Sequence, residues 1–553
     1  MSVHNRVVPP IWTTGWTDSL NTGTWRSAFP VHQKRTAPCH GACPVNGEIP
    51  VWIQQIREGS YQEAWLTLAE NNPFPAVTGR VCHHPCESKC NRGEYDGAVA
   101  INAMEQFIGD LALEKEWTLP APAADLGQKA AVIGGGPAGL SCAYQLRRRG
   151  YQVTIYEAQP ELGGMLRYGI PKYRLPKEVV EGEIRRLLAL GFEVNTGRKV
   201  NPDELAKLQS EYSAVFLAIG AQQARRLPQF PEDPRVFDGL SILAAVNQGK
   251  QPVLGQQVTV IGGGSVAMDV ARSVKRLGSQ VKVLALEDND HLPAQREEVR
   301  EALEEGIRIL GGVLVHKVAG INGQLKLDCA RVVLETSAQP GEIRPIMLTE
   351  DGFSIETDNI ILAVGQDVEL DGWENEFAMN NSLLIKVKED YTTSRPGVYA
   401  GGDAASLERF VSMAIAQGKK AAGVIARNTG CDNGPREEAD SDLVRFEEIN
   451  TFYFPLIPQA SRELRNLQDG VGDFAEVRIG FTGEQTREQA ERCFSCGSCI
   501  QCDNCFYFCP DMAVAKDPDA REHYRILDQY CKGCGCCVEE CPRGAVVMKE
   551  ETR

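Results

Sequence analysis

The chain has 553 residues, a formal net charge of −16 and a hydrophobic content of 43%. Its acidic balance argues against nucleic-acid binding, which requires a basic surface. We find no run of about 18 apolar residues that would predict a membrane-spanning segment. The length leaves room for roughly three or four domains.

The cysteines form two groups, five between Cys39 and Cys90 and eleven between Cys493 and Cys541. Clustering with C-x-x-C spacing indicates metal ligands rather than disulfides. Thiols reserved for metal are typical of a reducing compartment, and the first residues have no apolar signal core, so we expect a cytoplasmic protein.

Residues 1–36 form an N-terminal extension that carries Trp12, Trp16 and Trp25. Beyond it, the amphipathic segments IPVWIQQI and YQEAWLTLA predict short helices, and the stretch LPAPAADLG predicts a linker. We therefore expect a small helical domain over residues 37–125. It contains the first group of cysteines, which are Cys39, Cys43, Cys82, Cys86 and Cys90.

The segment QKAAVIGGGPAGLSCAYQLRRRGYQVTIYEA, from Gln128, reads as strand, glycine loop, helix, strand and acid. Gly134 permits the tight turn, Gly136 lets the backbone approach a pyrophosphate, and Gly139 lets the helix pack on the strand. Glu157 can accept hydrogen bonds from ribose hydroxyls. This order of elements predicts a dinucleotide site rather than a glycine-rich turn without a ligand.

A second copy begins at Gln257 with QVTVIGGGSVAMDVARSVKRLGSQVKVLALE, where the fingerprint is Gly262, Gly264 and Ala267. Two copies predict two dinucleotides. Farther along, GVYAGGDA places Asp403 after a strand and before a helix rich in small residues.

The C-terminal segments CIQCDNCFYFCP and CKGCGCCVEECP both match C-x2-C-x2-C-x3-C-P. This pattern predicts two [4Fe–4S] clusters in a bacterial ferredoxin-like module, and it is not the pattern of a zinc site. Cys493, Cys496 and Cys536 are left over, and the first two leave the register of the first cluster open. By the crossover rule, one cluster takes Cys499, Cys502, Cys505 and Cys541, and the other takes Cys531, Cys534, Cys537 and Cys509.

With two GxGxxG units and the motif GVYAGGD, the sequence resembles two-dinucleotide flavoproteins, in which FAD binds the first unit and NAD(P)H an inserted second unit. ELGGMLRYGIPKYRLPKEVV and NPFPAVTGRVCHHPCESKC resemble the glutamate synthase small-subunit family, whose iron–sulfur domain is shared with dihydropyrimidine dehydrogenase. The ferredoxin tail is more similar to NAD(P)H-oxidising subunits of 2-oxoacid:acceptor oxidoreductases or of dissimilatory sulfite reductase.

The resemblance implies a multidomain α/β architecture that binds FAD and NAD(H). It assigns residues 126–232 and 350–431 to the FAD domain, 233–349 to the NAD(H) domain, 432–485 to a linker and 486–553 to a ferredoxin-like α+β domain. The residues expected to contact the dinucleotides are Gly134, Gly136, Pro137, Ala138, Gly139, Glu157, Gly164, Arg174, Gly220, Gly402, Asp403, Ser412, Met413, Ala414, Gly262, Gly264, Ser265, Ala267, Glu287 and Gly365.

In the family, the N-terminal domain holds two clusters, but the upstream C-x-x-C of the first is absent here. The resemblance therefore implies one [4Fe–4S] cluster, on Cys43, Cys82, Cys86 and the carboxylate of Glu105. Cys39 and Cys90 are left as neighbouring thiols or as remnants of the lost site. Two alternatives stay open: an all-thiolate cluster on four of the five cysteines, and a zinc site or metal-free thiols.

The second nucleotide unit ends in ALEDNDHLPA, with Leu286 and Glu287 where NADP-binding relatives carry arginines. A carboxylate beside a 2′-phosphate repels it. We therefore expect NAD(H) rather than NADP(H), although Ala267 in place of a third glycine is also found with NADP.

Hydride transfer moves two electrons and an iron–sulfur cluster carries one, so we expect the flavin to accept the hydride and pass on single electrons. Hydride transfer at FAD N5 requires no acid–base residue, so we expect none. We expect an NADH:acceptor oxidoreductase subunit that serves a catalytic subunit, with the 2-oxoacid:acceptor oxidoreductase type favoured. The alternatives are a glutamate synthase small subunit, the electron donor of a sulfite-reductase-type enzyme, and a non-catalytic electron-transfer module.

Overall fold

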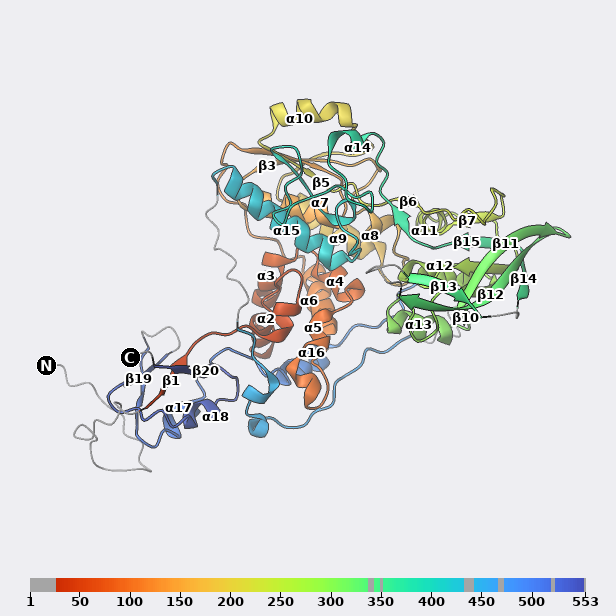
Figure 1. Cartoon of the computed structure of the whole chain (residues 1–553). Coiled ribbons are helices and arrows are strands. Elements are labelled where there is room, and N and C mark those ends of the chain that lie inside the picture. Colours follow the sequence, from red (N-terminus) through yellow and green to blue (C-terminus); the bar gives the residue numbers. More distant parts are fainter. Residues whose placement is uncertain are drawn as a thin grey trace.

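The computed structural model describes residues 26–336, 343–348, 352–431, 442–465, 472–518 and 523–551. Trp12, Trp16 and Trp25 lie outside these residues. A helical domain occupies the centre of the molecule, with one nucleotide unit above it, the second to one side, and the C-terminal module at the other end (Figure 1). None of the described helices combines the length and apolar character that crossing a bilayer requires.

The helical domain packs two of its helices unusually closely. A Cβ added to Gly79 would lie 2.4 Å from the backbone of Gln106, and one added to Gly109 would lie 2.3 Å from the backbone nitrogen of Ala76. These glycines let the helices touch through their backbones. The elements are α1 (Pro38–Ala42), α2 (Ile49–Arg57), α3 (Tyr61–Asn71), α4 (Pro75–Val81), α5 (Pro85–Ser88), the 3-10 turn η2 (Asn91–Glu94) and α6 (Ile101–Glu114).

The first nucleotide unit is a five-stranded parallel sheet in the order β17-β5-β2-β3-β4. Helix α15 packs on α7 so tightly that a Cβ at Gly418 would lie 2.2 Å from the carbonyl oxygen of Ala138. The elements are β2 (Lys129–Ile133), α7 (Pro137–Arg148), β3 (Gln152–Tyr156), α8 (Met165–Tyr168), α9 (Lys177–Leu188), β4 (Glu193–Asn195), α10 (Leu205–Glu211), β5 (Ala214–Leu217), α14 (Trp373–Glu376), β17 (Val398–Ala400) and α15 (Val411–Asn428).

The second unit is also a five-stranded parallel sheet, in the order β10-β9-β8-β15-β7. Strand β15 pairs with both β8 and β7, so the boundary expected at residue 350 is wrong and must follow this strand. The elements are β7 (Val236–Asp238), α11 (Gly239–Asn247), β8 (Gln257–Ile261), α12 (Ser265–Arg276), β9 (Gln280–Leu284), α13 (Arg296–Glu304), β10 (Arg308–Leu310) and β15 (Asn359–Leu362). A short ribbon of β6 (Gln223–Ala224) and β16 (Gln366–Asp367) joins the two units.

An antiparallel sheet that the sequence analysis did not predict covers the second unit. Strands β11 (Val313–Ile321), β12 (Gln324–Thr336), β13 (Ile343–Met347) and β14 (Phe353–Thr357) form it, with β12 paired to the other three. Alternate residues of β12, namely Leu325, Leu327 and Cys329, are buried against the parallel sheet.

The two ends of the described chain meet in the C-terminal module. Strand β1 (Ala28–His32) pairs antiparallel with β20 (Val546–Glu550), so part of the expected N-terminal extension belongs to this module. Helix α16 (Gly483–Glu491) instead packs on α2 and α6 of the helical domain, so the module begins after residue 486. Its other elements are α17 (Asn504–Tyr507), β18 (Val514–Lys516), β19 (Tyr524–Ile526) and α18 (Cys536–Glu539).

Candidate functional site

A cavity of about 1040 Å³ lies between the two nucleotide units, and both glycine loops line it. Its volume is at the upper end of the range of about 300–1,000 Å³ for small-molecule sites, as expected for more than one ligand. Most of the predicted cofactor residues line it, namely Gly134, Gly136, Pro137, Ala138, Glu157, Gly164, Arg174, Gly220, Gly262, Gly264, Ser265, Glu287, Gly365, Gly402, Asp403 and Ala414.

The first glycine loop is shaped for an anion. Gly134 has φ +109°, and a Cβ there would lie 2.2 Å from the carbonyl oxygen of Ala218. A Cβ on Gly136 would meet only Gly164, at 3.9 Å, so its backbone is open to the cavity at the N-terminus of α7. The Glu157 carboxylate accepts hydrogen bonds of 2.7 Å from the amides of Gly135 and Gln159, which hold it at the cavity. This arrangement fits a dinucleotide pyrophosphate and ribose.

The second loop repeats this geometry. Gly262 has φ +134°, and a Cβ there would lie 2.3 Å from the carbonyl oxygen of Ala363. A Cβ on Gly264 would meet open space. A Cβ on Gly263 would lie 2.9 Å from Oε2 of Glu287, and one on Gly135 would lie 3.0 Å from Oε2 of Glu157. The two carboxylates thus occupy equivalent positions in the two units.

Four predicted cofactor residues do not line the cavity. A Cβ on Gly139 would lie 1.9 Å from the carbonyl oxygen of Gly134, so this residue packs α7 against the loop behind the site. Ala267 is fully buried at the matching position of α12. Met413 is absent from the lining, and Ser412 lines a separate cavity among cysteines. Ser412 therefore lies with the cysteines rather than with the other predicted cofactor residues.

Asp403 lies at the cavity in a 3-10 turn (Gly402–Ala404) that follows β17. Burial raises the pKa of its carboxyl to about 6, while the nearby Arg409 cation acts in the opposite direction. A half-buried carboxyl with this pKa can accept a hydrogen bond from a ligand hydroxyl near neutral pH. That property fits the ribityl contact that the resemblance implies.

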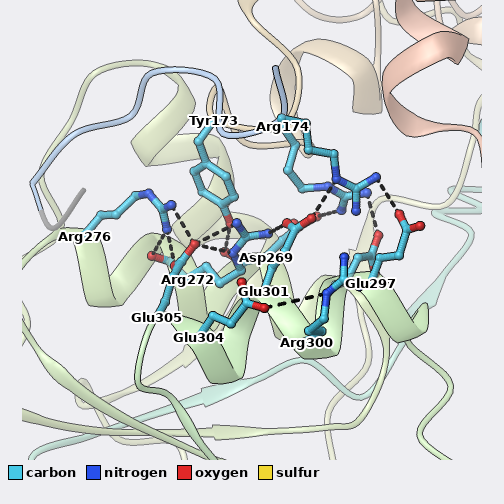
Figure 2. Close-up of polar contacts among 12 residues, drawn as sticks. Tyr173, Arg174, Asp269, Arg272, Arg276, Glu297, Arg300, Glu301, Glu304 and Glu305 are labelled. Carbon is cyan, nitrogen blue, oxygen red and sulfur yellow. Dashed lines mark hydrogen bonds and ion pairs between the residues drawn. The ribbon is translucent and has the colours of Figure 1, made fainter. Parts of the chain in front are cut away.

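Arg174 was expected to bind a cofactor, but in the structure its guanidinium pairs with two carboxylates of the second unit. Its guanidinium forms ion pairs with Asp269 and with Glu298, on helices α12 and α13 of the second unit (Figure 2). Its side chain still lines the cavity. Arg174 therefore joins the two units, and its cation is already balanced by two carboxylates.

Several cations at the cavity were missed by the sequence analysis. Arg198, Lys199, Arg225 and Arg409 line it. They lie in loops outside any motif, so no spacing signal could have found them. Three of them already have carboxylate partners, since Arg198 pairs with Glu204, Lys199 with Glu369 and Asp371, and Arg225 with Asp367.

A second, small cavity in the helical domain is lined by Cys43, Cys82, Cys86 and Glu105. Cys43 ends α1, Cys82 ends α4, Cys86 lies on α5 and Glu105 on α6, so four elements contribute to it. The structure thus brings together the four expected ligands of the N-terminal cluster.

The Glu105 carboxyl group is held in one orientation. The Thr78 hydroxyl donates to Oε1 at 2.7 Å and the Asn72 amide donates to the same oxygen at 3.0 Å. These bonds orient the group without using Oε2. Burial raises the pKa of Glu105 to about 7, and the two hydrogen bonds act against this shift. A carboxylate in such a place is stabilised when a metal cluster supplies positive charge.

Cys39 and Cys90 do not line this cavity. They line another one, together with Cys493 and Cys496 from the far end of the chain. Cys39 lies inside α1 and Cys43 leaves it with extended backbone, so two cysteines four residues apart face different cavities.

In the C-terminal module, the cysteines gather in two sets. Burial raises the pKa of Cys505, and the neighbouring thiols of Cys499, Cys502, Cys537 and Cys541 raise it further. Burial raises the pKa of Cys537 to about 12, with added effects from Cys509, Cys531 and Cys534. Cys541 acts on Cys505 and Cys509 acts on Cys537, as the predicted crossed ligation requires. Cys537 also acts on Cys505, so the two sets adjoin.

Among the described residues, no three cysteine, histidine or acidic side chains are as close together as the ligands of a single metal ion. The four sulfur ligands of a cubane cluster are more widely spaced, because four irons lie between them.

Two protein-family models match the sequence. The pyridine nucleotide-disulphide oxidoreductase model matches residues 128–418. The model of dihydropyrimidine dehydrogenase domain II, with its 4Fe-4S cluster, matches residues 30–117. The two matches cover the two nucleotide units and the helical domain.

Characterised relatives match over most of the chain. The beta subunit of NADP(+)-dependent formate dehydrogenase from Moorella thermoacetica is 35% identical over 83% of this chain and 70% of its own length. The beta subunit of NADPH-Fe(3+) oxidoreductase from Geobacter sulfurreducens is 32% identical over 84% and 75%. The glutamate synthase [NADPH] small chain of Escherichia coli is 33% identical over 69% and 87%.

Proposed function

Since the chain belongs to the pyridine nucleotide-disulphide oxidoreductase family and carries a dihydropyrimidine dehydrogenase-type iron–sulfur domain, we propose that it passes electrons between NAD(H) and a partner catalytic subunit. It is an NAD(P)H-dependent flavoprotein oxidoreductase with 4Fe-4S electron transfer. The proposed route runs through FAD, the N-terminal cluster and the two clusters of the ferredoxin-like module, in either direction.

The position of helix α15 carries this proposal. Val411 and Ala414, in its first turn, line the dinucleotide cavity, while Ser412 between them lines the cavity of the cysteines. Burial raises the pKa of Cys82, which lines the same cavity, to about 12, and Ser412 acts against this shift. The Ser412 hydroxyl is buried without a hydrogen-bond partner among the described residues. One helical turn therefore separates the two cavities, as direct electron transfer between their cofactors requires.

FAD, when bound, supplies the conversion between two-electron hydride transfer and one-electron transfer. The chain's own residues bind and orient the dinucleotides. The glycine loops receive the pyrophosphates, Glu157 and Asp403 accept hydroxyl hydrogen bonds, and the shared cavity brings the two ligands together. No side chain has to move a proton for hydride transfer.

We further propose that NAD(H) is the preferred dinucleotide. Glu287 occupies in the second unit the place that Glu157 occupies in the first, where a carboxylate suits a free ribose hydroxyl and repels a 2′-phosphate. The formate dehydrogenase and glutamate synthase relatives are named for NADP or NADPH. The dihydropyrimidine dehydrogenase subunit PreT of Escherichia coli, 33% identical over 70% of this chain, is named as NAD-dependent.

For the partner, we propose a catalytic oxidoreductase subunit that docks at the ferredoxin-like module. The relatives described above do not support a 2-oxoacid:acceptor oxidoreductase as this partner. A formate dehydrogenase type is favoured instead, because the Moorella subunit is 35% identical over 83% of the chain, against 32% over 84% for the Geobacter subunit. A glutamate synthase role is disfavoured by the additional cysteine-rich module of residues 499–541, and a sulfite-reductase partner has no observation in its support.

Anaerobic mixing of the complete, cofactor-loaded chain with NADH tests the proposal. Flavin absorbance should bleach, and a viologen dye should be reduced. In the Cys82→Ser variant, NADH should still bleach the flavin. Electron paramagnetic resonance should show that reduction of the C-terminal clusters is slowed at least tenfold. If NADH bleaches no flavin in the wild-type chain, the dinucleotide sites are structural and the proposal is wrong.

A further inference from the structure

Four cysteines that the sequence analysis did not bring together line one cavity between the helical domain and the C-terminal module. They are Cys39 from α1, Cys90 from the start of η2, and Cys493 and Cys496 from the segment after α16. All four are free thiols. Cys39 and Cys493 are each only 8% exposed.

Cys493 and Cys496 form a C-x-x-C pair, which the first group of cysteines lacks. The helical domain has no C-x-x-C upstream of Cys39. Helix α16, which precedes Cys493, packs against α2 and α6, and this contact carries the pair into the helical domain. The buried Arg492 then anchors the segment by donating to the carbonyls of Ala98, at 2.7 Å, and Gly97, at 2.6 Å.

Hydrogen bonds to these sulfurs run in the direction that metal-bound thiolates need. The Ser495 amide donates to Sγ of Cys493 at 3.3 Å, and the Asn91 side chain donates to Sγ of Cys496 at 3.6 Å. Donors directed at sulfur stabilise a cluster's negative charge and tune its potential.

Expected ligands elsewhere in the chain have the same local arrangement. The amides of His84 and Gly533 donate to Sγ of Cys82, at 3.3 Å, and of Cys531, at 3.4 Å. Each of these donors lies two residues after its cysteine with positive φ: +40° for His84, +68° for Gly533 and, at the matching position, +49° for Ser495. Left-handed backbone is costly for residues other than glycine and accumulates at functional sites.

Two cysteines outside the two groups form hydrogen bonds in the opposite sense. The thiol of Cys329 donates to the carbonyl of Leu327 at 3.7 Å, and the thiol of Cys431 donates to the carbonyl of Thr429 at 3.6 Å. In these two residues the thiol is the donor, whereas Sγ of Cys493 and Sγ of Cys496 accept.

A buried cation borders the cavity. The Arg543 guanidinium donates to the carbonyl of Cys493 at 3.1 Å and to the carbonyl of Phe494. Arg543 lies two residues after Cys541, so its contacts with Cys493 and Phe494 place the cation where the C-terminal module meets this cavity. A cluster with four thiolates is an anion, and an adjacent cation offsets the cost of burying it.

We propose that Cys39, Cys90, Cys493 and Cys496 hold a fourth [4Fe–4S] cluster, ligated jointly by the helical domain and the segment that leads into the C-terminal module. This cluster links the N-terminal cavity to the ferredoxin-like clusters. Ile101 lines both this cavity and that of Cys43, Cys82 and Cys86, so the two are adjacent. The assignment of these four ligands is independent of the proposed function. Only the role of this cluster in passing electrons rests on the proposed function.

Iron and acid-labile sulfide counting on the complete chain, purified anaerobically, tests the site. Four clusters require about 16 irons per chain and three require about 12. The Cys493→Ser/Cys496→Ser double variant should lose about four irons and one signal from the dithionite-reduced paramagnetic spectrum, with FAD content unchanged. The Cys431→Ser control should lose neither.

The wild-type count stands even if the double variant fails to fold. About 12 irons in the wild type, a full iron count in the folded double variant, or about one bound zinc lost with these cysteines would each overturn the proposal. Dithionite reduction does not involve NADH, so this result is separate from the flavin-bleaching test of the proposed function.

Discussion

Arg174 Nη1 lies 2.7 Å from Asp269 Oδ2, and this buried ion pair joins a loop of the first nucleotide unit to helix α12 of the second. The pair belongs to a larger network in which Arg272 contacts Glu301 and Glu305 (Figure 2). The segment that leads to the C-terminal module also joins it, through Arg478 and Glu301 at 2.7 Å. The orientation of the two units toward their shared cavity therefore depends on charge pairing.

Arg174→Ala leaves two buried carboxylates without their cation, so it should cost about 3–5 kcal/mol of stability. It should also slow flavin reduction by NADH, because the second unit loses its fixed orientation. Thermal unfolding and stopped-flow absorbance measure the two effects. Arg465→Ala, which removes a half-exposed pair with Asp473, should change stability by only about 0–1 kcal/mol. Equal effects of the two variants would contradict the prediction.

Two glycines of the first loop should respond differently to alanine. Gly134→Ala places a Cβ 2.2 Å from a carbonyl oxygen at positive φ, so it should destabilise the chain by at least about 1–3 kcal/mol. Gly136→Ala adds a Cβ in open space facing the cavity, so the fold should be kept while FAD affinity falls at least about tenfold. Unfolding midpoints and FAD titration of the stripped chain distinguish them. A stable Gly134→Ala would be evidence against the strained turn.

Glu287→Arg replaces a carboxylate that repels the 2′-phosphate of NADPH with a cation that attracts it. The ratio of kcat/KM for NADH to that for NADPH should fall by about tenfold or more, equivalent to about 1.4 kcal/mol. Steady-state kinetics with both dinucleotides measure the ratio. Glu389→Arg makes the same charge change at an exposed position and should leave the ratio unaltered. An unmoved ratio in Glu287→Arg would mean that Glu287 is a solvated loop residue.

Glu105→Ala removes the only carboxylate among the described residues that line the cavity of Cys43, Cys82 and Cys86. The variant should lose about four irons per chain, whereas Glu105→Cys should keep the cluster at a shifted midpoint potential. Iron analysis and potentiometric titration measure these outcomes, and Glu114→Ala, at the exposed end of the same helix, is the control. Retention of all iron in Glu105→Ala would favour an all-thiolate cluster.

Asp403 should make the FAD-free chain less stable as pH rises. Burial raises its pKa from 3.8 to about 6, so the folded state binds the proton more tightly than the unfolded chain. The stabilisation is complete below pH 4 and is lost as pH rises through 6, by up to about 3 kcal/mol. Asp403→Asn lacks this loss, so it should match the wild type at pH 4 and exceed it at pH 7 in urea unfolding. A constant difference across this range would rule out the carboxyl as the titrating group.

The sequence by itself determined the two nucleotide units and the chemistry of the site, because these depend on short-range patterns. A glycine loop between a strand and a helix has few other uses, so Gly134 and Gly262 could be assigned from spacing alone. The repeated C-x2-C-x2-C-x3-C-P likewise allows two iron–sulfur clusters to be predicted from spacing alone. The strand Asn359–Leu362 was placed in the wrong unit, since its pairing with β8 lies about 100 residues away and leaves no local signal.

Only the tertiary structure decided how the cysteines are grouped. Cys39 and Cys43 are neighbours in the chain, yet one turn of helix directs them into different cavities. Cys493 and Cys496 reach Cys39 because α16 folds back onto the helical domain, a contact that depends on surfaces far apart in sequence. Likewise, Arg174 was predicted to bind a cofactor, and only the tertiary structure shows that Asp269 and Glu298 of the second unit pair with its charge. Spacing identifies ligands, but packing decides which of them share a site.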